Sequence, residues 1–138
     1  MATYGFGAAY AGTDDKVAEF VSLGVAFVGY DIDNRNGNPA PALHAILRQI
    51  EVGDIIFLKS FPPSQGLIVK AVGIATDVSR ISEHRHGLGY GPDVHWTSVE
   101  QYTLGRLNDR YDNMRGGALF REYNPDVIRR LLTDLIEA

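Results

Sequence analysis

Cysteine is missing from this chain of 138 residues, and the chain has no long apolar run. Without a thiol, the protein has neither a thiolate nucleophile nor a cysteine-ligated zinc or iron–sulfur site. The absence of cysteine is also typical of proteins in a reducing compartment. The opening sequence MATYG has no basic segment followed by an apolar one, and no stretch approaches the ~20 apolar residues of a membrane span. We therefore expect a cytoplasmic protein that makes no contact with a membrane.

Positive charge is scarce relative to negative charge. The 13 lysines and arginines are outnumbered by 17 aspartates and glutamates, which gives a formal net charge of -4. Nonspecific binding of duplex nucleic acid depends on a basic surface, so this balance argues against such a role. It leaves open the recognition of one flipped base or of a free nucleotide. A hydrophobic fraction of 45% is enough for one core, and we expect residues 1–138 to form a single domain.

The motifs of common enzyme classes are absent as well. The chain has no Gly-x-Ser-x-Gly elbow, no phosphate-binding loop and no His-Glu-x-x-His segment. Residues 5–9, GFGAA, lack the third glycine of a dinucleotide-binding fingerprint. We therefore expect a protein that binds a ligand without catalysing a reaction and that needs no cofactor.

Three histidines raise the question of a metal site. His84 and His86 are two residues apart, and His95 lies in the next predicted strand. Two histidines on one strand face could ligate zinc. However, Arg85 separates them and the nearby glycines favour a solvated loop, so we expect no bound metal. We assign His44 to packing or to the surface.

Hydrophobic periodicity and turn residues predict strands separated by short helices. One helix is expected to start near residues 13–15 and to stop at Gly24, a second covers residues 42–50, and a third starts at Asn124-Pro125. The predicted strands cover residues 3–10, 25–32, 54–61, 67–77, 93–99 and 116–123. Residues 82–92 read as a loop rich in glycine and histidine, and residues 100–113 as a loop with helical turns.

These elements predict the α+β class. Too few β–helix–β units are present for a doubly wound parallel sheet. The alternative that fits is a small, mostly antiparallel β pseudo-barrel, with short helices covering its ends and a C-terminal helix.

The order of several short segments is more informative than any one of them. An N-terminal strand ending in GAAY (7–10) is followed by GVAFVGYD (24–31), VGDIIFLKS (52–60), VGIA (72–75), VHW (94–96) and Asn124-Pro125. This series, which covers nearly the whole chain, resembles the EVE-like domains of the PUA superfamily, which occur in prokaryotic defence and modification-dependent restriction proteins. The resemblance implies a pseudo-barrel with a pocket for a modified or flipped nucleobase. The family often has tryptophan where this chain has Tyr10 and Tyr30.

A base pocket needs flat apolar rings for stacking and a few polar groups that read the base edge. The aromatic candidates are Tyr10, Phe27, Tyr30 and Trp96, although core packing is the simpler role for Phe27 and Trp96. Three polar candidates stand at strand ends: Asp31 and Ser60 for hydrogen bonds to the base edge, and Lys59 for a phosphate. For each of these polar residues, the alternative is that it simply faces water at the end of its strand.

Three arginines near Tyr111 could flank a phosphate path, because arginine binds phosphate oxygens in a bidentate manner. They are Arg106, Arg110 and Arg115. Ordinary surface ion pairing with Asp109 and Asp112 is the stronger expectation.

Several functions remain open at this point. The first is a binding module that recognises a modified nucleobase in DNA or RNA and serves prokaryotic defence or restriction, with an effector protein or a second copy as possible partner. The second is a stand-alone protein, of host or phage origin, that sequesters a free nucleotide or a nucleotide-derived signal. The third is a protein-interaction subunit that docks through its C-terminal helix. A small hydrolase is the least supported.

Overall fold

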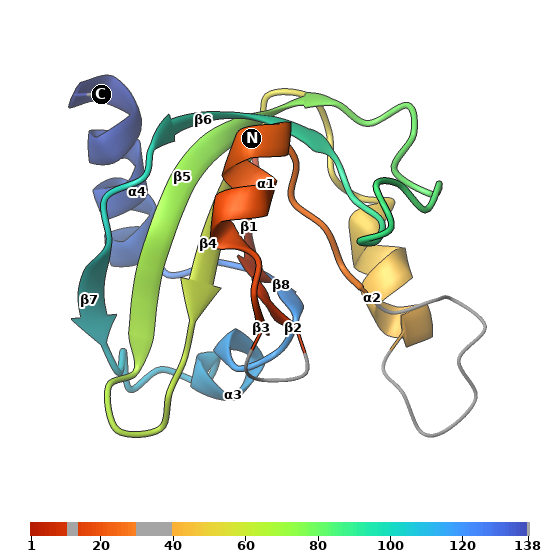
Figure 1. The fold of residues 1–138 in the computed structure, drawn as a ribbon. Helices are drawn as coiled ribbons and strands as arrows, with labels where there is room; N and C mark the ends of the chain where they lie inside the picture. Colours follow the sequence, from red (N-terminus) through yellow and green to blue (C-terminus); the bar gives the residue numbers. More distant parts are fainter. Residues whose placement is uncertain (11–13, 30–39, 138) are drawn as a thin grey trace.

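The computed structural model describes residues 1–10, 14–29 and 40–137, apart from the side chains of Tyr10 and Ala40. Within these residues the chain is α+β, with helices packed around a mixed sheet (Figure 1). The strands are β1 (Thr3–Gly7), β2 (Ala9–Tyr10), β3 (Asp14–Asp15), β4 (Ile55–Ser60), β5 (Leu67–Asp77), β6 (Asp93–Ser98), β7 (Tyr102–Gly105) and β8 (Leu119–Arg121). The helices are α1 (Val17–Leu23), α2 (Ala40–Leu47), α3 (Asp112–Arg115) and α4 (Pro125–Glu137).

The main sheet has the strand order β6-β5-β4-β1-β8, and β7 pairs with the first part of β5. Most neighbours are antiparallel, as expected, and β4 and β5 form the predicted hairpin. However, β1 and β4 run parallel, with Thr3 opposite Ile55 and Gly7 opposite Lys59. A parallel pair needs a crossover connection, and here α1 and α2 lie in it.

The expected closure into a barrel is not found in the described part of the chain. β8 pairs only with β1, and the sheet ends on the other side at β6 and β7. Beyond β6, single bridges join Val25 to Asp93 and Val28 to Tyr90, so residues 24–28 extend this edge instead of joining β8. The physical reason lies in the burial of β4, whose side chains are covered on both faces. A barrel strand has only one inward face, whereas this sheet is open and packed on both sides.

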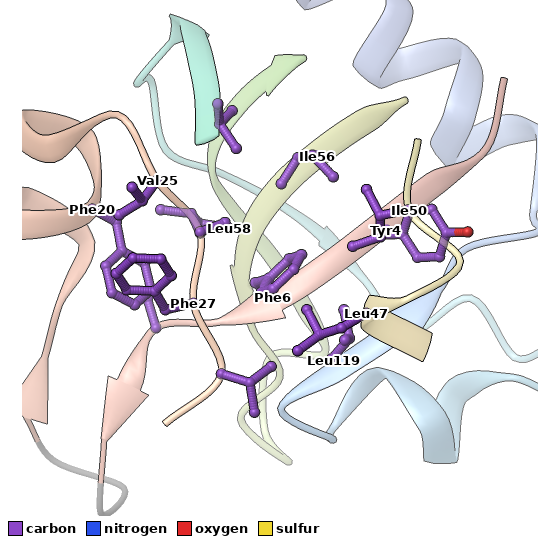
Figure 2. Close-up of a cluster of buried hydrophobic side chains, with 14 of the residues drawn as sticks. Tyr4, Phe6, Phe20, Val25, Phe27, Leu47, Ile50, Ile56, Leu58 and Leu119 are labelled. Carbon is purple, nitrogen blue, oxygen red and sulfur yellow. The ribbon is translucent and has the colours of Figure 1, made fainter. Parts of the chain in front are cut away.

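Two hydrophobic cores lie on opposite faces of the sheet. Along β4, Ile56 and Leu58 enter the first core, and Ile55 and Phe57 enter the second. Figure 2 shows the first core, where Phe6 of β1 lies between side chains of β4 and Leu47 of α2. The second core is covered by α4. The sheet therefore packs against helices on both of its faces.

Several local predictions are confirmed. Helix α1 ends at Gly24, which has the left-handed conformation (φ 69°), and the β5 boundaries agree with the predicted strand. Helix α4 begins where Asn124-Pro125 predicted it, and Asn124 Oδ1 accepts a hydrogen bond from the Asp126 backbone N–H at 2.9 Å. These boundaries depend on a few neighbouring residues, which is why the sequence predicted them.

Two predictions require correction. The region 100–113, expected to be a loop, contains strand β7 as well as helix α3. Tyr102 and Leu104 of β7 alternate with polar neighbours and pack on the second core, but four residues are too short for a clear pattern. In place of the predicted strand 25–32, the structure has two single bridges, at Val25 and at Val28. Residues 30–32 lie outside the described part.

Candidate functional site

The loop of residues 82–92 folds back against residues 24–28. The Val28 backbone N–H donates to the Tyr90 carbonyl at 2.7 Å, and the Tyr90 N–H donates to the Val28 carbonyl at 2.9 Å. His86 (φ 57°) and Gly87 (φ 66°) have left-handed backbone conformations that reverse the chain inside the loop. These contacts bring the side chains of the loop to residues 24–28 and to α2.

Three aromatic side chains from two distant segments meet at this place. The Tyr90 ring packs edge to face against two histidine rings. The ring centres lie 4.7 Å apart for His44 of α2 and 5.2 Å apart for His84. His44 is buried, Tyr90 is half-buried and His84 is exposed, so the group runs from the core to the surface. We call His44, His84 and Tyr90 the histidine–tyrosine cluster.

Next to this cluster, Phe27 supports two further side chains. The exposed His86 ring stacks on the fully buried Phe27 ring at 6.2 Å and 26°. The Arg85 guanidinium lies 5.2 Å from the centre of the same ring. Phe20 meets Phe27 edge to face at 5.8 Å from within the core. Phe27 is thus a core residue, as its simpler role predicted, and it also positions His86 and Arg85.

Arg85 brings a buried positive charge to this site. Its Nη1 donates to Asp93 Oδ1 and its Nη2 to the Gly91 carbonyl, both at 2.6 Å. Its Nε is buried and has no hydrogen-bond acceptor among the residues that the structure describes. A buried donor without an acceptor costs about 1–3 kcal/mol, so the contacts of Nη1 and Nη2 with Asp93 and Gly91 must offset this cost.

Three predicted site residues have no described side-chain position. The backbone of Tyr10 lies in β2 opposite Asp14, but its side chain is outside the described part of the structure. Tyr30 and Asp31 lie outside the described residues altogether. In the sequence they follow Val28 and Gly29 directly.

Two of the polar and aromatic candidates are engaged inside the protein. Lys59, only 4% exposed, donates from Nζ to the Arg115 carbonyl at 2.6 Å and to the Gly117 carbonyl. Burial lowers the pKa of Lys59 to about 8. Trp96 is half-buried, and its indole N–H donates to the Phe20 carbonyl at 3.2 Å. Ser60 is half-buried at the end of β4.

A second charged group surrounds Arg115, which is fully buried. All five of its N–H donors are used: Nε and Nη2 bind Glu122, Nη1 and Nη2 bind Asp109, and Nη1 also binds Asp112. Hydrogen bonds from Arg115 hold the pKa of Asp109 well below its usual range. Arg115 pairs with Asp109 and Asp112 as expected, but in the interior and not at the surface. Arg106 and Arg110 form no ion pair with the described carboxylates, so the expectation is wrong for these two.

The three histidines considered for a metal do not converge. His84 packs on Tyr90 and His86 on Phe27, while His95 is exposed on β6 opposite Ile74. Among the residues described, no group of three or more histidine, aspartate or glutamate side chains could hold a metal ion. In the same part of the chain, no helix has the length and apolar character needed to cross a membrane.

A shallow open groove of about 630 Å³ lies elsewhere, along α1. It is mainly apolar and includes Val17, Val21 and Val99. It contains none of the rings of the histidine–tyrosine cluster, so we treat it as a separate feature of the surface.

The sequence pattern indicates the loop 82–92 but does not indicate the residues that give it a defined structure. These residues are Tyr90, which packs between two histidines, and Arg85, which turns inward. The available signal was the density of glycine around histidine and arginine, because such a loop can reverse and turn one side chain inward. The contact with His44 depends on the fold and has no local signal.

No protein-family model matches the chain, and a search of curated proteins found none that matches it significantly.

Proposed function

We propose that this protein is a non-catalytic binding module that recognises a modified nucleobase in DNA or RNA. The observation that carries the proposal is the collection of rings around the loop 82–92, with the Arg85 guanidinium over the Phe27 ring. A nucleobase requires flat apolar surfaces for stacking and polar groups for its edge. The exposed His86 ring, which stacks on Phe27, supplies a flat surface, and Arg85 places a positive charge beside it.

The resemblance to EVE-like domains supports the same ligand class and suggests a PUA-like arrangement. In this proposal Tyr30 and Asp31, which follow residues 24–28, contribute a second ring and a hydrogen-bond acceptor. Lys59 is not used as a phosphate contact, because its ammonium group is enclosed and bound to two carbonyls. The proposal also includes a biological role, which is the recognition of modified bases in prokaryotic defence or restriction.

The test is a thermal-shift and calorimetric screen with 5-methylcytosine, 5-hydroxymethylcytosine and N6-methyladenine, as nucleosides and within short oligonucleotides. His86→Asn removes the stacked ring and keeps a residue that tolerates the left-handed conformation. Stacking on one ring contributes about 1–3 kcal/mol, so we expect affinity to fall about 5- to 150-fold. His95→Asn, at an exposed histidine of β6, is the matched control and should bind normally.

Equal affinity of the His86→Asn variant and the wild type would remove this surface from the site. The net charge of -4 favours a second candidate, the sequestration of a free nucleotide. Tight binding of a mononucleotide, with no binding of any oligonucleotide, would favour that function over recognition within a strand.

A further inference from the structure

Four side chains form a continuous row on the surface near α3 and β8. The Arg110 guanidinium lies 5.0 Å from the centre of the Tyr111 ring, and Tyr111 lies 5.4 Å from Tyr123. The Arg121 guanidinium lies 5.0 Å from the centre of the Tyr123 ring. Tyr123 is 48% exposed, so the row faces solvent. We call these four residues the arginine–tyrosine row.

The two arginines of the row have no carboxylate partner among the described residues, unlike most other arginines there. The arginines that do form ion pairs are Arg80, Arg85, Arg115, Arg129 and Arg130. Arg106 resembles the row, because it lies 5.6 Å from the centre of the Phe61 ring and has no ion pair. The chain has a net charge of -4, yet Arg110 and Arg121 place positive charge here that no described carboxylate neutralises.

The buried Arg115 group holds the row in place. Residues 109, 112, 122 and 124 bind one another or Arg115. They alternate along the chain with the four residues of the row, of which Arg110 and Tyr123 are exposed and Tyr111 and Arg121 half-buried. Arg115 joins α3 to Glu122, which directly follows β8, and Figure 1 shows α3 and β8 at the same end of the molecule. The two tyrosines therefore meet because an ion-pair network centred on the fully buried Arg115 links their segments.

Stacked guanidinium groups suit one class of ligand. A ring under the guanidinium plane limits its motion but leaves N–H groups at its edge for an anion. Arginine binds phosphate oxygens strongly and in a bidentate manner. Two such groups at the two ends of one row can contact two phosphates of an extended strand.

We propose that the arginine–tyrosine row binds the phosphate backbone of a nucleic-acid strand. The inference rests on the proposed function for its ligand class and adds a site outside the histidine–tyrosine cluster. Arg110 and Arg121 contact phosphates, and Tyr111 and Tyr123 hold their guanidinium groups in position. This site supplies affinity for the strand without reading its sequence.

The experiment measures binding of a fluorescein-labelled single-stranded DNA by anisotropy over a series of salt concentrations. The test variant is Arg110→Gln with Arg121→Gln. The control is Lys70→Gln with Arg129→Gln, which removes the same charge from residues that pair with carboxylates. Circular dichroism and thermal unfolding establish that both variants are folded, and Arg110→Gln alone, at an exposed residue, replaces the double variant if Arg121→Gln disturbs β8.

We expect the row variant to lose at least about tenfold in affinity, and the slope of log affinity against log salt to become shallower by about 1.4, or about 0.7 for each lost phosphate contact. The control should keep both values. Similar losses in the two variants would overturn the proposal, because they would report net charge alone. Equal competition by polyglutamate would also overturn it and would point to an acidic peptide.

The two proposals fail in different ways. If a modified nucleoside binds and no oligonucleotide does, the row proposal is overturned and the base site stands. If oligonucleotide binding depends on the row but His86→Asn has no effect and no nucleoside binds, the base-site proposal fails and the row stands. Retained nucleoside binding by the row variant, with loss of the strand, supports both.

Discussion

Lys59 is a buried ammonium group that connects two distant parts of the chain. It lies on β4, and its Nζ donates to carbonyls of Arg115 and Gly117 between α3 and β8. Removing a charged group from water is unfavourable, and this burial lowers the pKa of Lys59 from 10.5 to about 8. The side chain therefore acts as a structural contact whose protonation depends on pH near neutrality.

The lowered pKa predicts how stability changes with pH. The unfolded chain binds more protons at Lys59 than the folded chain between about pH 8 and about pH 10.5, so the free energy of unfolding rises with pH there. We expect an increase of about 2 kcal/mol between about pH 7.5 and about pH 9.5, measured by urea denaturation. Lys59→Met, which cannot titrate, should lack this increase. The same increase in Lys59→Met would assign the effect to another group.

At the scale of elements, the close approach of residues 24–28 to residues 90–94 depends on Gly91. A Cβ atom built on Gly91 would lie 1.8 Å from the Ala26 carbonyl oxygen, which is far inside van der Waals contact. The backbone hydrogen bonds from Ala26 to Pro92 and from Val28 to Tyr90 lie on either side of this point. The pairing that positions Phe27 and the loop 82–92 thus requires a residue without a side chain.

Gly91→Ala should push the two segments apart and lower the free energy of unfolding by about 2–3 kcal/mol, measured by urea denaturation. Binding of any ligand at the histidine–tyrosine cluster should weaken with it. Gly116→Ala is the matched control, because its Cβ would meet its nearest neighbour at an ordinary 3.8 Å and φ is -77°. It should change stability by no more than about 0.5 kcal/mol. A stable Gly91→Ala variant would show that the segments can separate without cost.

At the scale of the whole molecule, the two cores share the strands that separate them. β4 lies between β1 and β5 and supplies side chains to both cores. The interior is therefore expected to unfold in one step, although helix α4 contacts only one face. Trp96, the only tryptophan, packs against the first core and reports on that face.

Leu131→Ala in α4 tests this coupling, because Leu131 is fully buried in the second core. We expect a loss of about 2–5 kcal/mol, with the midpoints of Trp96 fluorescence and far-ultraviolet circular dichroism falling together. Ile136→Ala, at an 80% exposed residue of the same helix, should leave both midpoints nearly unchanged. A shift in circular dichroism without a shift in fluorescence would indicate that the two faces unfold separately.

Sequence patterns alone determined the elements whose signals are local. Asn124-Pro125 specified the start of α4, Gly24 the end of α1, and a long β-branched run the whole of β5, because caps, left-handed residues and strand preference act over a few neighbouring residues. The α+β class and the hairpin of β4 and β5 followed from the same signals. Core packing, the simpler role expected for Phe27, also agrees with the structure.

Only the tertiary structure decided how these elements meet. The parallel pairing of β1 with β4, the open sheet, the carbonyl partners of Lys59 and the contact of His44 with Tyr90 all join residues separated by long stretches of chain. Such contacts depend on which apolar faces are buried together, and a single sequence carries no local record of that choice. The polar partners then follow from the packing, because a buried lysine or arginine must bind whichever acceptors the fold brings within reach.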